Sequence, residues 1–198
     1  EELPLTLFGH SMGSFVARRF TQLYSDQMHA AIYCGTGATN AIHIAGHQLA
    51  KVLSRLQGPK VQSLLMNSLS FGSFNKDIPN VETAFDWICT DQKEVQKYID
   101  DPQCGFISTN QFFVDLTGGL LKIAKPQEIA KVRQDLPILF VSGSHDPVGD
   151  YGKGVSRVAN ELEKSGIENI CVYLFENMRH EILKEKNILN GFPQSITR

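Results

Sequence analysis

The sequence predicts an α/β protein with a parallel sheet that is interrupted by a helical insertion. Two observations carry this prediction. Apolar runs of strand length alternate with amphipathic helical segments near both ends of the chain, and the long stretch between them has helical and irregular patterns only. Strands that alternate with helices form parallel sheets, because each helix returns the chain across one face of the sheet. The 198 residues suffice for one domain with a substantial core and an insertion.

The segment LTLFGHSMGSF, residues 5–15, predicts a first strand, a sharp turn and a helix. The apolar run before Gly9 has the length of a buried strand, and from Ser14 onward apolar residues recur at helical spacing. Ser11 stands at the apex of the turn. A serine here is either the N-cap of the helix or a nucleophile on a strained elbow. The flanking Gly9 and Gly13 favour the elbow, because a side chain at either position is expected to crowd the crossing of strand and helix.

The other predicted elements follow the same α/β alternation on either side of the insertion. His29 to Gly37 predicts a second buried strand that ends in a glycine turn. We expect the core domain to comprise residues 1–36 and 132–198, and the insertion residues 37–131. Within the insertion the pattern predicts a strong amphipathic helix over 43–57, an Asn/Ser/Gly-rich stretch over 67–77, a second helix over 82–101 and an aromatic segment over 104–123. After it we expect a strand in LPILFVSGSHDPVG, a helix from Gly154 to Ser165 and a strand over 169–177.

Composition excludes several classes of function. A formal net charge of −2 and a pI near 6.3 provide no basic surface for nucleic acid, so we expect no nucleic-acid partner. The longest apolar runs are far shorter than the ~20 residues that cross a bilayer, so we expect no transmembrane segment. The four cysteines are scattered and no Cys/His cluster has metal-ligand spacing. We therefore expect free thiols, a cytoplasmic location, no metal and no cofactor.

A serine nucleophile needs a general base within hydrogen-bond reach and a carboxylate that orients this base. Asp146 lies in SGSHDPVGD, just beyond the third predicted strand, and His180 lies in ENMRHE, just beyond the fourth. Both therefore belong to the edge of the sheet at which parallel strands end. We expect Ser11 to be the nucleophile, Asp146 the acid and His180 the base.

Asp150 is the main competitor for the role of the acid. We prefer Asp146, because it comes first after the end of the strand, although an Asp before Pro147 is also a common turn pair. The other histidines near these motifs have structural explanations, such as packing, local hydrogen bonds or a place on a helix face without further metal ligands. These histidines are His10, His43, His47 and His145.

The motifs LFGHSMGS, FDW, DPQCGF, SGSHDPVGDYGKGV and RHEIL extend from residue 5 to residue 185. With them the chain resembles the serine-hydrolase branch of the α/β-hydrolase family, the lysophospholipase-like and monoglyceride-lipase-like proteins, which are also grouped with serine aminopeptidases. The resemblance implies the C-terminal half of the α/β-hydrolase sheet, with the insertion as a cap over the active site. It also implies the same triad, an oxyanion donor in the backbone N–H of Met12, and a small acyl ester as substrate. The aromatic residues of the cap become candidates for an acyl-chain pocket: Trp87, Phe106, Phe112 and Phe113.

The chain also departs from the family pattern. Members carry about four strands before the elbow, whereas this sequence begins with EELPLT and has no initiator Met. We therefore expect an N-terminally truncated member whose first strand is an open edge, which invites an oligomer. We also expect peripheral lipid contact through the cap. In the tail, Gly191 and Pro193 stand where members continue a closing helix.

The leading prediction is a hydrolase of carboxylic esters, of the lysophospholipid or monoacylglycerol type, that works through an acyl-serine intermediate. One alternative is a serine aminopeptidase, which needs acidic groups in the cap to bind an α-amine. The acidic residues that keep this alternative open are Asp86, Asp91, Asp100, Asp101 and Asp115. A second alternative is a catalytically inert fragment that acts as a binding module.

Overall fold

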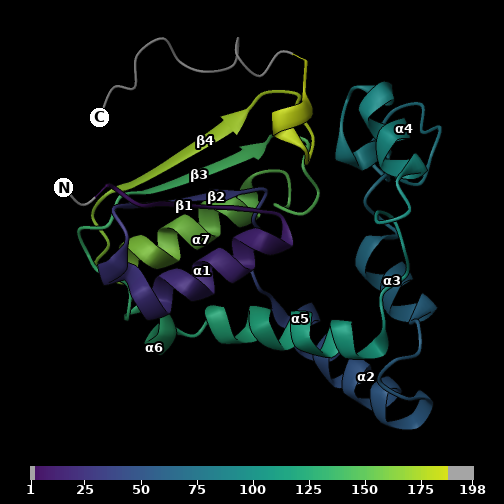
Figure 1. Cartoon of the computed structure of the whole chain (residues 1–198), viewed down its shortest axis with the longest axis horizontal. Helices are drawn as coiled ribbons and strands as arrows, with labels where there is room; N and C mark the ends of the chain where they lie inside the picture. The colour runs from purple at the N-terminus through teal and green to yellow at the C-terminus, as the bar shows by residue number, and fades with distance from the viewer. Residues whose placement is uncertain (1–2, 187–198) are drawn as a thin grey trace.

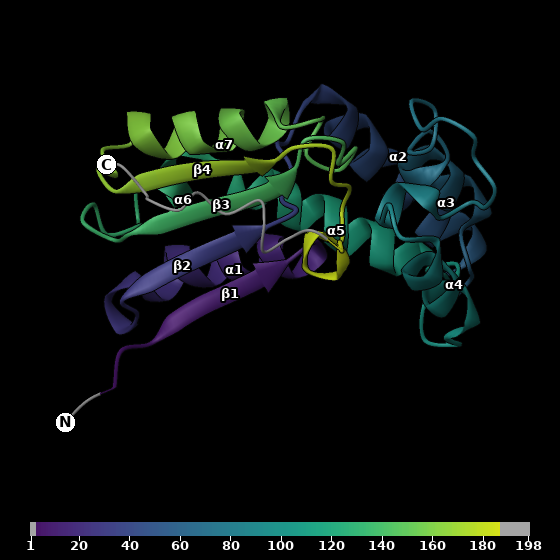
Figure 2. The same ribbon diagram turned by 90° about the horizontal axis from the view of Figure 1, so that it is seen from above.

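The computed structural model describes residues 3–186. Its centre is a parallel sheet of four strands in the order β1-β2-β3-β4, which confirms the predicted α/β class. The strands are β1 (Thr6–His10), β2 (Ala30–Cys34), β3 (Ile138–Gly143) and β4 (Ile170–Phe175). All three strand pairs are parallel, so the four carboxyl ends lie at one edge of the sheet. Figure 2 shows the four arrowheads pointing toward the helical insertion.

Two helices, α1 (Met12–Tyr24) and α7 (Lys153–Lys164), cover one face of the sheet (Figure 1). The main hydrophobic core fills the space between that face and the helices, and its largest members include Tyr33, Phe140 and Leu136. Two of the polar side chains buried at this core, Tyr33 and Arg18, have hydrogen-bond partners. The Tyr33 hydroxyl donates to Thr21 Oγ1 at 2.8 Å, and the Arg18 guanidinium donates to the carbonyl of Gly37 at 3.0 Å. Burial lowers the pKa of Arg18 to about 10.

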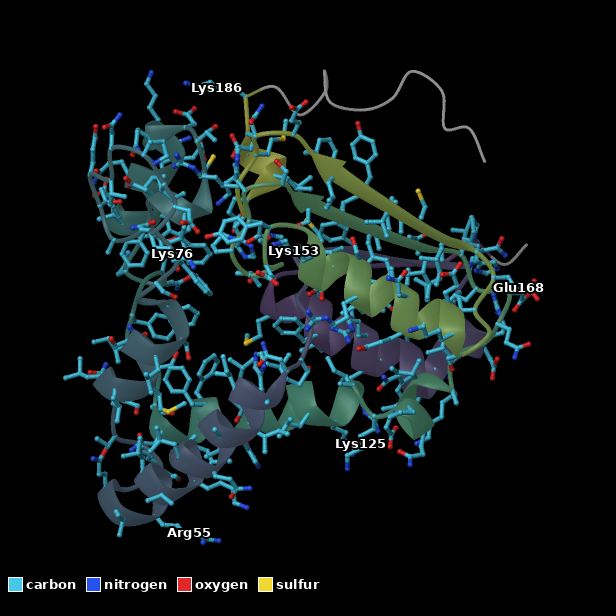
Figure 3. The ribbon with its side chains drawn as sticks, turned by 180° about the vertical axis from the view of Figure 1, so that it is seen from behind. Arg55, Lys76, Lys125, Lys153, Glu168 and Lys186 are labelled. Carbon is cyan, nitrogen blue, oxygen red and sulfur yellow. The ribbon has the colours of Figure 1, made fainter. Side chains whose placement is uncertain are left out.

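The insertion between β2 and β3 is mostly helical. Its elements are α2 (Ala41–Gln57), α3 (Leu64–Phe71), a 3₁₀ turn (Asp86–Ile88), α4 (Gln92–Asp100), α5 (Asn110–Ile123) and α6 (Pro126–Ile129). Helices α2 and α5 pack against each other, and Ala50, Met66 and Phe113 are buried at the centre of this unit. Figure 3 shows Arg55 at the far end of α2, pointing into solvent.

The predicted helix over 82–101 is wrong in its first half. The Asp86 carboxylate accepts from the N–H of Glu82 and from the hydroxyl of Thr83. A 3₁₀ turn follows at Asp86–Ile88, in which the N–H of Ile88 donates to the carbonyl of Phe85 at 3.0 Å. Asp91 then caps α4, accepting from the N–H of Lys93 at 3.1 Å. Short polar side chains that bond to nearby backbone compete with helix formation, and this explains the interruption.

The C-terminal end of the insertion packs into the main core. Ile129 of α6 and the following Val132 are buried in the main core under the sheet. The α6 turn therefore packs with the predicted core domain, although it precedes residue 132. The division into residues 1–36 and 132–198 for the core and 37–131 for the insertion stays a prediction.

Strand β1 forms one edge of the sheet, since among residues 3–186 it pairs with β2 alone. Apolar side chains surround this edge, and Phe8 is 46% exposed. Beside it, an apolar groove of about 510 Å³ lies between α1 and α5, with Met12, Phe15 and Phe112 in its lining. The expected oligomer through this edge stays a prediction. No helix in the described part of the chain combines the length and apolar character needed to cross a membrane.

Candidate active site

Ser11 occupies a strained turn between β1 and α1. Its backbone has φ 54° and ψ −125°, a region that residues other than glycine rarely adopt. The Ser11 N–H donates to the carbonyl of Cys34 at 2.9 Å, and the Ser11 carbonyl accepts from Ser14 N–H at 2.8 Å and Ser14 Oγ at 2.6 Å. The Ser11 side chain makes no capping hydrogen bond to α1. The strand, turn and helix thus have the geometry of a nucleophile elbow.

The two glycines that flank Ser11 differ in whether a side chain would fit at their positions. A Cβ atom at Gly9 would lie 2.5 Å from the carbonyl oxygen of Gly13 and 2.6 Å from the Cβ of Ala17, so strand and helix can cross only without a side chain there. A Cβ atom at Gly13 would meet no described heavy atom within 4 Å beyond the backbone of its own helix. The prediction of crowding at both glycines is therefore correct for Gly9 and wrong for Gly13.

Asp146 and His180 follow the ends of β3 and β4 and meet at the carboxyl edge of the sheet. Asp146 Oδ2 lies 2.9 Å from His180 Nδ1, and the two residues are 0% and 3% exposed. Asp146 also accepts from the hydroxyl of Ser142 at 3.2 Å and from the N–H of Val148 at 2.9 Å. The buried carboxylate is therefore held by three donors. Ser142 was not predicted from the sequence, because a serine inside a strand has no distinctive local pattern.

Two further glycines make room for this pair. A Cβ atom at Gly143, the last residue of β3, would lie 2.1 Å from the carbonyl oxygen of Met178 and 2.2 Å from that of Arg179. A Cβ atom at Gly35, whose φ is 58°, would lie 2.9 Å from the Cε1 atom of His180. A glycine directly after an apolar strand is the only sequence signal for either position.

His10 lies against His180. The centroids of the two rings are 4.8 Å apart, His10 Nε2 lies 3.2 Å from the backbone carbonyl oxygen of His180, and His10 Nδ1 lies 3.7 Å from a carboxylate oxygen of Glu181. Burial and the neighbouring His180 lower the pKa of His10, and the carboxylates of Glu181 and Asp146 oppose this shift in part. Of the two explanations expected for His10, packing is observed, whereas its hydrogen-bond partner is 170 positions away in the sequence and is not local.

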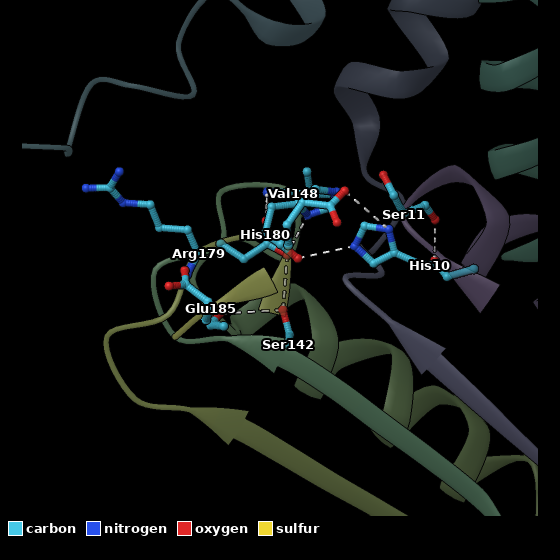
Figure 4. Close-up of polar contacts among 11 residues, drawn as sticks. His10, Ser11, Ser142, Val148, Arg179, His180 and Glu185 are labelled. Carbon is cyan, nitrogen blue, oxygen red and sulfur yellow. Dashed lines mark hydrogen bonds and ion pairs between the residues drawn. The ribbon is translucent and has the colours of Figure 1, made fainter. Parts of the chain in front are cut away.

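The structure brings Ser11 to the same edge of the sheet as His180 (Figure 4). Within the described residues no hydrogen bond joins Ser11 Oγ to His180, and hydrogen bonds of this kind are often long before a substrate binds. Met12 is the first residue of α1, where backbone N–H groups have no acceptor within the helix. Cys34 also lies close by, but burial, with Asp146 and Glu181 as further causes, raises the pKa of its thiol to about 12. Cys34 therefore stays a neutral thiol beside the serine.

The four aromatic residues predicted for an acyl pocket occupy different environments. Trp87 is 9% exposed, and its ring centroid lies 5.2 Å from that of His180. Phe112 lines the apolar groove beside α1, and Phe106 is 63% exposed. Phe113 has no exposed surface, since it is packed against Ala50 in the centre of the helical unit. Phe113 is thus a core residue, which excludes contact with a substrate in this structure.

The rival site residues have other partners. Asp150 is exposed at φ 48°, and within the described chain no hydrogen bond links it to His180. His43 bonds to Asn40 at the start of α2, and His47 Nδ1 lies 2.9 Å from the hydroxyl of Thr117. Residues 3–186 contain no group of three or more His, Cys, Asp and Glu side chains that could hold a metal ion. The four cysteines are not bridged.

A parallel sheet that carries an elbow serine and a buried carboxylate–imidazole pair at its carboxyl edge is the architecture of an α/β-hydrolase. The chain belongs to the α/β-hydrolase family described as "Serine aminopeptidase, S33", whose model matches residues 1–187. Comparison with curated protein sequences finds no match.

Solved structures of hydrolases have a similar fold. The chain matches a thermostable carboxyl esterase from Bacillus coagulans, solved with glycerol, at 27% identity and a TM-score of 0.87, over 96% of this chain and 61% of that one. A lipase in its open form matches at 23% identity and a TM-score of 0.84, over 96% and 62% of the two chains. A soluble variant of monoglyceride lipase from Saccharomyces cerevisiae, solved with a substrate analogue, matches at 18% identity and a TM-score of 0.69, over 95% and 58%. The chain thus spans about three fifths of the length of these proteins.

The position of His10 predicts a specific pH dependence of stability. Its pKa in the folded state lies below its ordinary value of 6.5, so the unfolded chain binds more protons as the pH falls through 6.5. The free energy of unfolding therefore carries no penalty from His10 above pH 6.5, and it decreases as the pH falls below that value. His10→Gln, which cannot titrate, is therefore expected to lose less stability than the wild type between about pH 7 and about pH 5 in urea unfolding. His145→Gln changes an exposed histidine and is the control. Equal losses in wild type and His10→Gln would contradict the prediction.

Proposed function

We propose that this chain carries the catalytic residues of a serine hydrolase that cleaves carboxylic esters, of the lysophospholipid or monoacylglycerol type. The observation that carries the proposal is the buried 2.9 Å hydrogen bond between Asp146 and His180, at the same sheet edge as a serine in a left-handed elbow. Membership of a hydrolase family supports it. The similar structures of a carboxyl esterase and a monoglyceride lipase support an ester as substrate.

The proposed reaction has two steps. Ser11 Oγ attacks the acyl carbonyl carbon while His180 Nε2 takes its proton, and Asp146 holds the imidazole in the tautomer that can accept. The backbone N–H of Met12 stabilises the oxyanion. His180 then gives the proton to the departing alcohol, which leaves an acyl-Ser11 ester. Water attacks this ester with His180 again as base, and this step releases the acid and restores Ser11.

The acidic residues of the insertion favour an ester over a peptide as substrate. An aminopeptidase needs carboxylates that are available to an α-amine in the site. The side chains of Asp86, Asp91, Asp100, Asp101 and Asp115 each accept a hydrogen bond from a residue at most four positions away. Asp86 is also fully buried. These carboxylates therefore have structural roles, which leaves the aminopeptidase as the weaker alternative.

Fluorophosphonate labelling tests the nucleophile. The natural protein is expected to be labelled on Ser11, and Ser11→Ala is expected to lose the label, because the probe reacts with a serine activated by a general base. Ser68→Ala, which removes an exposed hydroxyl on α3, is the matched control and should keep the label. p-Nitrophenyl esters should be turned over much faster than aminoacyl anilides. Absence of labelling in the natural protein would favour the inert binding module, and preference for the anilides would favour the aminopeptidase.

Paired substitutions test the acid. Asp146→Asn is expected to fold but to present the wrong tautomer of His180 to Ser11, so kcat should fall by as much as about 10⁴-fold. Asp150→Asn should change kcat little, because Asp150 is exposed and within the described residues makes no hydrogen bond to His180. Steady-state kinetics on both variants, with folding checked by thermal melting, is the measurement. If kcat falls strongly in Asp150→Asn but stays near the wild-type value in Asp146→Asn, the assignment of the acid is wrong.

We further propose a cytoplasmic enzyme whose insertion makes peripheral contact with lipid. Large apolar side chains on α2 and α3 support this, since Ile42 is 77%, Leu56 80% and Leu69 62% exposed. Replacing Leu56 and Leu69 together with Glu is expected to reduce sedimentation of the protein with phosphatidylcholine vesicles, because burial of apolar area drives such binding. Val172→Glu, on the sheet, is the control. Equal sedimentation of all variants would count against lipid contact.

A further inference from the structure

Residues 86–90 of the insertion lie beside residues 179–185, which include the proposed base. The backbone N–H of Glu181 donates to the carbonyl of Ile88 at 2.7 Å, and the N–H of His180 points to the carbonyl of Trp87 at the longer distance of 3.5 Å. The indole of Trp87 packs against the imidazole of His180, with the two ring planes at 45°. The insertion therefore forms one wall around the imidazole.

Arg179 joins the two segments. It belongs to residues 176–186, which follow β4 and which we call the His180 loop. Its guanidinium donates to the carbonyl of Asp86 at 2.6 Å and to the carbonyl of Cys89 at 2.9 Å. Burial raises the pKa of Asp86, but hydrogen bonds from Thr83 and the Glu82 N–H, together with the charge of Arg179, lower it further than burial raises it. The negative Asp86 thus sits close to the positive Arg179.

Glu185 closes the contact from the other end. This carboxylate is 5% exposed and accepts from the N–H of Thr90 and the N–H of Arg179, both at 3.0 Å, and from the hydroxyl of Thr90. A buried carboxylate without donors would be costly, and here both oxygens are satisfied by groups on the two segments. We call Arg179 and Glu185 together the clamp.

The His180 loop has little internal structure of its own. Among the described residues after Phe175, where β4 ends, the regular structure is limited to the 3₁₀ turn Ile182–Lys184. Bonds to other segments must therefore fix His180. Asp146 bonds to its ring, His10 lies against its backbone carbonyl, and the clamp ties the residues around it to the insertion. A general base must be oriented within narrow limits, and a misplacement of about 1 Å can cost about 100-fold in rate.

We propose that Arg179 and Glu185 are positioning residues for His180, which act by fastening its loop to residues 86–90 of the insertion. This rests on the proposed serine hydrolase function. The segment 86–90 is then a fixed part of the catalytic unit, and Trp87 supports the base. Any opening of the insertion for a substrate takes place outside this segment.

The test introduces substitutions into the natural protein and compares the kcat of variants that break the clamp with the kcat of a variant that keeps its hydrogen bonds. Arg179→Met keeps the aliphatic stem but removes both bonds to the insertion, and Glu185→Ala removes the carboxylate. Each is expected to lower kcat about 10- to 100-fold with KM unchanged, and to slow fluorophosphonate labelling in parallel. Glu185→Gln should restore kcat, because its amide oxygen can accept from both N–H groups and its NH₂ can donate to the hydroxyl of Thr90. Arg55→Met and Glu94→Ala, on α2 and α4, are the controls.

A second readout separates positioning from mere stability. Trp87 is the only tryptophan of the chain, so its emission and its quenching by acrylamide report directly on the segment beside His180. Both should change in Arg179→Met and Glu185→Ala and stay as in the wild type in Glu185→Gln. If the clamp variants melt at a lower temperature but keep kcat and the labelling rate, the clamp is structural only. If KM rises with kcat unchanged, it acts on substrate binding. Either result overturns the proposal while labelling of Ser11 upholds the proposed function; an unlabelled wild type overturns both.

Discussion

The close approach of two loops at Gly143 is the constraint on which the site depends. The backbone of the His180 loop passes so near the end of β3 that a single Cβ atom at Gly143 would collide with two carbonyl oxygens. Because the loops touch there, the N–H of Ser144 donates to Phe175 and the N–H of His145 donates to Met178, and the backbone itself sets the spacing of Asp146 and His180. Any side chain at Gly143 would separate the carboxylate from the imidazole.

Because the carboxylate–imidazole pair is buried, its polar atoms need hydrogen-bond partners within the protein. A buried charge is tolerated only where its hydrogen-bonding capacity is satisfied, and Asp146 achieves this with Ser142, Val148 and His180. The same low-polarity surroundings keep Cys34 a neutral thiol and disfavour the charged form of His10. A neutral Cys34 thiol is a poor nucleophile, which agrees with the proposal that Ser11 is the group that reacts.

The sequence predicts this framework because its signals are local. Apolar runs mark the strands, the spacing of Gly9 and Ser11 marks the elbow, and Asp146 and His180 are found because parallel strands end at one edge of a sheet. What the sequence does not reveal depends on contacts between distant segments. The bonds from Arg179 to carbonyls about ninety positions away have no local pattern, and the burial of Phe113 depends on how α2 packs on α5. The 3₁₀ turn at Asp86 interrupts a helical pattern because one carboxylate captures nearby donors.

The contact between the insertion and residues 179–181 is made largely to backbone carbonyl groups of the insertion. Arg179 and Glu181 bind carbonyl oxygens of residues 86–89, and every residue has a carbonyl whatever its side chain. The contact therefore depends mainly on the backbone path of residues 86–90. The side chains it uses are the ring of Trp87, which packs against His180, and the hydroxyl of Thr90, which donates to Glu185. The exposed apolar residues of α2 and α3, such as Leu56 and Leu69, lie outside this segment, so substitutions there leave the backbone carbonyl groups that Arg179 and Glu181 bind unchanged.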